Sequence, residues 1–169
     1  MRERAAIMKG EIQVSGVIGT NLVAQVAFLV NDIHETLKKY EEFLGVKGTE
    51  PELAGDPEVT KTQYLGQPAP LSNCYLAFLP VGENLTIELI QPNEHPSTWR
   101  DCLNANGEGF HHIAFCVKDA DEAAKACEDF GMELKQRGIY GDQSGQYIYL
   151  DATAQLKTYI ELLHSFVQK

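Results

Sequence analysis

An internal duplication constrains the fold of this chain more than any other feature of its sequence. The segment "VAQVAFLVNDIHETLKKYEEFLGV", from Val23, and the segment "GFHHIAFCVKDADEAAKACEDFGM", from Gly109, place similar residues at the same offset. In both, an apolar stretch leads to an acidic residue and then to an amphipathic stretch that ends near a glycine. A repeat of this size predicts two copies of one supersecondary unit that bury their apolar faces together.

The first copy shows where its elements begin and end. "VAQVAFLV" is typical of a strand, and Asn31 or Asp32 can cap the helix that follows it. Apolar residues then recur at helical spacing up to Leu44, and Gly45 is a typical helix terminator.

The second half of each copy also corresponds. "CYLAFLPVGENLTIELIQP" and "GQYIYLDATAQLKTYIELLHS" each predict two strands around a turn, and each closes on Ile-Glu-Leu, with Glu88 and Glu161 at the centre. Each unit therefore runs strand, helix, then two or three strands, which predicts an α+β fold. Because the helix must cover one face of its sheet, the other face is free to curve around a cleft.

These patterns divide the chain into four parts. Residues 1–21 form an N-terminal extension, an added strand or an arm on a partner subunit, and residues 22–93 form the first module. Residues 94–107 form a bridge whose helix starts after Pro96, with Ser97 or Thr98 as its cap, and ends at Gly107, and residues 108–169 form the second module. Residues 47–72 are rich in Pro and Gly, and we expect one strand and a loop over the cleft there.

Composition excludes several classes of partner. The net charge of −10 argues against nucleic acids, which require clustered Lys and Arg. We expect no membrane contact, because no apolar run is long enough to span a bilayer, and no signal peptide. The four cysteines form no CxxC pair, so we expect a cytoplasmic protein with reduced thiols.

Strand alternation then sorts the polar side chains. The side chain of Glu88 points to the opposite face of its strand from Ile87 and Leu89. That of Glu161 likewise points away from Ile160 and Leu162. By the same rule and by the duplication, His112 corresponds to Gln25, whereas His111 points the other way or lies at the rim. The residues that share the inner face of the two modules are Gln25, Glu88, His112 and Glu161.

A divalent metal ion accounts for this set. A lone glutamate or histidine in a strand is more often structural, but two matched pairs favour a metal site. Three oxygen ligands and one imidazole suit Zn, Ni, Co, Mn or Fe(II), and an octahedral ion would keep two positions for water or substrate.

The motifs "QVAFLVNDIHETLKKYEEFLGV", "LPVGENLTIELIQP" and "GEGFHHIAFCVKDADEAAKACEDFGMEL" resemble the vicinal oxygen chelate superfamily, especially methylmalonyl-CoA epimerases and glyoxalase I. The resemblance implies paired βαβββ modules that form a curved eight-stranded mixed sheet around a metal-centred cleft. It places the ligands at the same four positions and makes Glu161 the candidate catalytic base. It also implies a homodimer. Candidate pocket residues are Tyr64, Tyr147 and Tyr149.

The function predicted from the resemblance is a metal-dependent isomerase, epimerase or lyase. It would remove a proton next to a carbonyl and stabilise an enolate at the metal, on an acyl-CoA or a small hydroxy- or keto-compound. One alternative is a glyoxalase I-like thiol-adduct lyase. The resemblance supports it because the first ligand position is commonly histidine in epimerases but glutamine, as at Gln25, in eukaryote-type glyoxalase I. Another is a metal-free binding or resistance protein, although two inward carboxylates without a partner would be costly.

Overall fold

The computed structural model describes residues 15–166 of the chain. The part of the expected N-terminal extension before residue 15 lies outside this range. Residues 15–22 form bends and a turn ahead of the first strand. No described helix is both long and apolar enough to cross a membrane.

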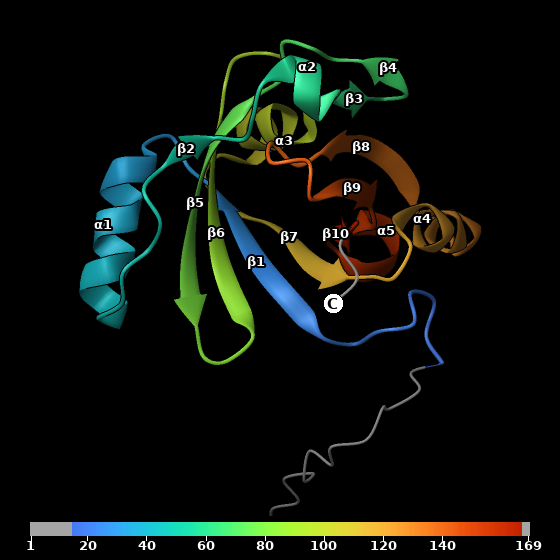
Figure 1. The fold of residues 1–169 in the computed structure, drawn as a ribbon, viewed down its shortest axis with the longest axis horizontal. Helices are drawn as coiled ribbons and strands as arrows, with labels where there is room; N and C mark the ends of the chain where they lie inside the picture. Colours follow the sequence, from blue (N-terminus) through green and yellow to red (C-terminus); the bar gives the residue numbers. More distant parts are fainter. Residues whose placement is uncertain (1–14, 167–169) are drawn as a thin grey trace, which may run out of the picture.

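One mixed sheet curls through the molecule, and its strands follow the order β2-β5-β6-β1-β7-β10-β9-β8-β3-β4 (Figure 1). The strands of the first half are β1 (Val23–Leu29), β2 (Glu52–Leu53), β3 (Gln63–Tyr64), β4 (Gln67–Pro68), β5 (Cys74–Val81) and β6 (Leu85–Pro92). Those of the second half are β7 (Gly109–Cys116), β8 (Glu133–Ile139), β9 (Gly145–Asp151) and β10 (Tyr159–Ser165).

The duplication appears in the pairing of these strands. β1 pairs in parallel with β6, and β7 pairs in parallel with β10, while β1 and β7 pair antiparallel at the centre. The outer pairs β5–β6 and β9–β10 are both antiparallel. The two modules therefore repeat one topology on either side of the β1–β7 junction.

The predicted count of eight strands is wrong, because the sheet has ten. The eight strands from β2 to β8 in the sheet order correspond to the paired modules. The additional β3–β4 hairpin comes from the first half of the chain but pairs with β8 of the second, joining Gln63 to Arg137. The Pro- and Gly-rich segment thus crosses from one module to the far edge of the other.

The helices α1 (Ile33–Leu44) and α4 (Ala120–Asp129) lie on opposite flanks of the sheet (Figure 1). Both follow the same local pattern, since Asp32 and Asp119 cap them by accepting a backbone N–H three residues on. Gly45 ends α1 in the left-handed region, as expected. Ile33 and Leu37 of α1 pack on one half of the sheet, and α4 packs on the other with its alanines and Cys127.

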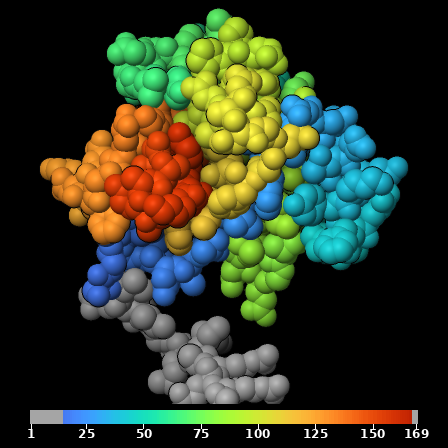
Figure 2. Space-filling view, turned by 180° about the vertical axis from the view of Figure 1, so that it is seen from behind, coloured from blue at the N-terminus to red at the C-terminus, as the bar shows by residue number. Residues whose placement is uncertain are grey.

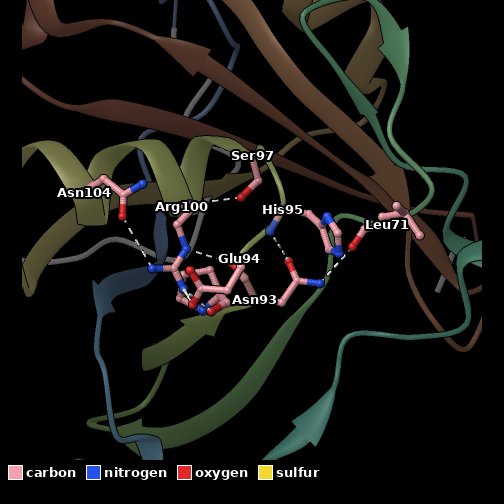
Figure 3. Close-up of polar contacts among 8 residues, drawn as sticks. Leu71, Asn93, Glu94, His95, Ser97, Arg100 and Asn104 are labelled. Carbon is pink, nitrogen blue, oxygen red and sulfur yellow. Dashed lines mark hydrogen bonds and ion pairs between the residues drawn. The ribbon is translucent and has the colours of Figure 1, made fainter.

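The bridging helix α3 (Thr98–Asn106) is capped by Ser97 and ends at Gly107, as the sequence predicts. Figure 2 shows the segment that contains α3 and β7 between α1 and the orange part of the second module. Arg100 turns back on the chain, where its guanidinium donates to the carbonyls of Pro92 and Asn93 and pairs with Glu94 at 3.0 Å (Figure 3). These contacts fix α3 to the end of β6.

The loop that follows α1 reaches the turn between β8 and β9. Gly55 and Gly141 meet there so closely that a Cβ on Gly141 would lie 2.5 Å from the carbonyl oxygen of Ala54. This close contact holds the loop of the first module, with the short helix α2 (Pro57–Thr60), against the second module. A shorter helix, α5 (Thr153–Leu156), connects β9 to β10.

Candidate metal centre and substrate cavity

Four neighbouring strands at the centre of the sheet carry the four residues selected from the sequence. Glu88 lies on β6, Gln25 on β1, His112 on β7 and Glu161 on β10. Ala27 stands opposite both Glu88 and His112 in the ladders, and Ala114 stands opposite both Gln25 and Glu161. Because directly paired residues project to the same side of a sheet, all four side chains share one face.

Two alanines provide the space between these side chains. Ala27 and Ala114 are both fully buried, and they occupy equivalent places in the two modules. A larger side chain at either position would project into the cluster. The duplication thus supplies both the polar groups and the room in which they meet.

Three of the four side chains converge within bonding reach of a single ion. The Nε2 atom of His112 lies 3.0 Å from Oε2 of Glu161 and 3.3 Å from Oε2 of Glu88. One ligand atom from each of these three residues lies within 4.8 Å of the other two. Gln25 lines the same cavity as Glu88 and Glu161.

The polar atoms of this cluster are buried but unsatisfied. Within the described residues, the atoms Gln25 Oε1, Glu88 Oε2, His112 Nε2 and Glu161 Oε2 are buried and make no well-directed hydrogen bond. Buried polar groups are nearly always hydrogen-bonded or bound to a metal. The donor set therefore fits a divalent cation, and the buried Glu88, His112 and Glu161 could bind one.

Charge within the cluster is strongly coupled. Burial, and then repulsion from Glu161, raise the pKa of Glu88, although His112 opposes this rise. Burial disfavours the charged form of His112, but the carboxylates of Glu161 and Glu88 outweigh it and raise the pKa of His112 to about 9. In the metal-free protein a proton on His112 therefore takes the place of a cation.

Strict alternation would send His111 to the opposite face, but its side chain lies at the rim of the cluster, the other position that the sequence allows. The side chain of His111 is buried, its ring stacks on Tyr159 at 5.2 Å, and its Nδ1 lies 2.9 Å from Nδ1 of His112. Burial, and then the charge of His112, hold the pKa of His111 well below its usual value. A neutral His111 thus contacts the side of His112 that faces away from the carboxylates.

A cavity of about 910 Å³ opens above the cluster, and it includes Gln25, Glu88 and Glu161 in its wall. Tyr147 and Tyr149, predicted as pocket residues, also line it, together with Trp99. The ring of Tyr149 lies edge-on to His112, with 4.9 Å between the ring centroids.

Tyr64 lies elsewhere. It does not line this cavity, and its hydroxyl donates to a carboxylate oxygen of Asp101 on α3. Its strand β3 belongs to the hairpin that pairs with β8, so its side chain secures α3 to that hairpin.

The sequence interpretation missed several groups on the cavity wall. Glu50, Glu52 and Asp142 line it and are exposed to solvent. The general expectation of a loop over the cleft pointed to residues 47–72, but no local pattern distinguishes Glu50 or Glu52 from other surface glutamates.

Residues 24–150 match the family model described as "Glyoxalase/Bleomycin resistance protein/Dioxygenase superfamily". The chain belongs to this superfamily. The resemblance to the vicinal oxygen chelate proteins that the motifs indicate is therefore confirmed. No curated protein sequence gives a significant match to the chain.

Solved structures of this fold include methylmalonyl-CoA epimerases. The Mycobacterium tuberculosis epimerase has a TM-score of 0.64 and 19% identity, and the match covers 93% of this chain and 95% of that chain. A Streptomyces coelicolor epimerase variant in complex with 2-nitronate-propionyl-CoA has a TM-score of 0.61 and 22% identity, covering 86% of this chain and 94% of that chain. A hypothetical protein from Bacillus halodurans has a TM-score of 0.59 and 23% identity, covering 88% and 96%. Identities this low show that the chain has the same fold as these proteins, and they show no more than that.

Proposed function

We propose that this protein is a divalent-metal-dependent enzyme that removes a proton next to a carbonyl group, as an isomerase, an epimerase or a lyase. Four buried ligand atoms that make no well-directed hydrogen bond, beside a large cavity, carry the proposal. Gln25, Glu88, His112 and Glu161 would hold the ion. When bound, a divalent ion supplies a Lewis acid that polarises a substrate carbonyl.

The side chains divide the remaining work. Glu161 lies in the cavity wall, where we assign it as the base that takes the proton from the carbon next to the carbonyl. Glu88, on the other module, balances the charge of the site. Tyr149 packs edge-on against His112 and limits the access of water to it.

In simple exchange the proton returns to the same side of the same carbon atom. In epimerisation it returns to the opposite side of that carbon, and in isomerisation it goes to a different atom. A second proton carrier must reach the opposite side or a neighbouring atom of the enolate. Glu50, Glu52 and Asp142 are the carboxyl groups of the wall outside the four-residue cluster. The epimerase-like neighbours support this class of reaction by their fold.

A thiol-adduct lyase of the glyoxalase I type is the second candidate, because a glutamine at the position of Gln25 resembles the pattern of eukaryote-type glyoxalase I. Both reactions begin with the same proton transfer. Consumption of a hemithioacetal would distinguish the glyoxalase I-type reaction from the epimerase-type reaction.

Solvent deuterium exchange tests the proposal. The protein is incubated in D₂O with acyl-CoA esters, 2-hydroxy carbonyl compounds and a hemithioacetal, with and without a divalent ion. We expect metal-dependent deuterium incorporation next to the carbonyl of at least one compound. An absence of exchange in the whole panel, from protein shown to contain metal, would contradict the proposed chemistry.

A further inference from the structure

The wall of the cavity carries negative groups without positive ones. Glu50, Glu52 and Asp142 are exposed on it, and among the residues that the structure describes, no lysine or arginine lines it. The remaining polar wall residues are neutral hydroxyls and amides, such as Thr60, Ser72 and Asn73. The wall therefore has polar groups but no positively charged partner for a phosphate.

Aromatic rings form an apolar part of the wall. Trp99 packs edge-on against Tyr149, with ring centroids 5.9 Å apart, and Tyr147 lies 5.4 Å from Tyr149. Trp99 and Tyr149 are buried, and Phe78 adds a further ring to the wall. These rings suit an alkyl or aromatic group on the substrate.

The arginines of the described region make contacts of their own. Arg100 is held by backbone carbonyls and Glu94 at the end of β6 (Figure 3). Arg137 pairs with Asp121 at 2.7 Å. Lys61 lines a second, smaller hollow together with Glu58, so this hollow adds no net positive charge.

Building on the proposed function, we propose that the cavity binds an uncharged carbonyl compound with an alkyl or aromatic group, and that it disfavours coenzyme A thioesters. The phosphates of coenzyme A would meet three carboxylates without a compensating cation, and like charges in a cleft oppose association. Volume does not discriminate here, because 910 Å³ is ample for ligands of either kind. Charge alone separates the two classes.

Two thioesters with the same reacting group provide the test. Acetoacetyl-CoA and the uncharged acetoacetyl-pantetheine differ only in the phosphorylated nucleotide portion, and calorimetry on the metal-loaded full chain gives their dissociation constants. We expect the truncated thioester to bind at least about tenfold more tightly at low salt, and added salt to strengthen binding of the CoA ester by screening repulsion. Equal affinities, tighter binding of the CoA ester or no binding of the truncated ester would overturn the inference.

Charge-reversal variants identify the groups responsible. The double variant Glu50→Lys/Glu52→Lys should shift the ratio of the two dissociation constants by about tenfold in favour of acetoacetyl-CoA at low salt. Glu83→Lys, in the exposed β5–β6 turn outside the cavity wall, is the matched control and should change neither constant. An equal gain from Glu83→Lys would overturn the assignment to the cavity wall.

The proposed reaction and the proposed substrate class can be contradicted independently. If the thioesters bind in the expected order of affinity but no metal-dependent exchange occurs, only the proposed reaction is contradicted. Exchange with a reversed ranking would contradict the substrate class alone.

Discussion

His111 and His112, consecutive residues of β7, face each other through their Nδ1 atoms at 2.9 Å. Neighbouring side chains of a regular strand point to opposite faces, so this contact requires an irregular backbone. The ladder with β1 supplies it, because Ala27 pairs with His112 and Phe28 pairs with Phe110, which leaves His111 as an extra residue. A bulge of this kind redirects a side chain, and here it brings His111 beside the candidate ligand.

This contact gives His111 a positioning role. For Nε2 of His112 to bind a cation, the proton of the ring must sit on Nδ1, where the neutral His111 can accept it. Replacing His111 by Phe keeps a ring on Tyr159 but removes the acceptor, and we expect metal affinity to fall about 10- to 100-fold. Competition with a metal-binding dye measures this affinity.

Replacement of His111 by Asn restores a polar group and should recover part of the loss. Unchanged metal affinity in His111→Phe would show that the histidine pair has no part in binding.

Metal-free protein should lose stability as the pH rises. The pKa of His112 rises on folding from 6.5 to about 9, so its stabilising proton is fully present below pH 6.5 and is lost as the pH rises through 9. The raised pKa of Glu88 acts in the same direction. We expect a loss on the order of 1 to 3 kcal/mol in unfolding free energy between pH 6.5 and 9.5, and thermal melts of chelator-treated protein would measure it.

The variant His112→Gln lacks this titration and serves as the control for the pH series. A melting temperature that falls equally in wild type and His112→Gln would assign the pH dependence to other groups.

Glu161→Gln separates proton transfer from metal binding, because an amide oxygen can still coordinate an ion but cannot accept the proton. Deuterium exchange should fall on the order of 10²- to 10⁴-fold, and by more than in His111→Asn. The variant Glu83→Gln, at an exposed position, is the control for replacing a carboxylate by an amide. If His111→Asn lost more exchange than Glu161→Gln, the assignment of the base would be wrong.

The contact between Gly55 and Gly141 should hold one part of the cavity wall in place. A Cβ on Gly141 would lie 2.5 Å from the carbonyl oxygen of Ala54, so Gly141→Ala must displace the loop that carries Glu50 and Glu52. We expect binding of the truncated thioester to weaken several-fold while metal content stays at the wild-type level. Calorimetry and metal analysis of the same preparation check both, and a loss of metal would instead indicate a disturbed sheet.

The repeated units of the fold could be predicted from sequence because their signals are local and occur twice. Asp32 and Asp119 cap their helices in the same way, and Ser97 and Gly107 bound α3 as expected. The period of two along each strand is also local. It placed Glu88 and Glu161 on one face, and the duplication extended this to Gln25 and His112.

The remaining features depend on contacts that local patterns do not encode. The β3–β4 hairpin is short, and its partner β8 is distant in sequence, so neither the ten-stranded sheet nor the contact of Tyr64 with Asp101 could be inferred. The bulge at His111 adds one residue to a ladder, which breaks the alternation rule at that point. The assignment of the four side chains to a metal ion remains a prediction.

Metal content tests the central claim most directly. Protein purified without chelators, or dialysed against a divalent ion and then desalted, is analysed by elemental mass spectrometry. We predict about one divalent ion per chain in wild type and in Glu83→Gln, and a strong loss in His112→Ala and Glu88→Ala variants that remain folded by circular dichroism. Wild-type protein that contains no divalent ion and regains none on addition would contradict the account.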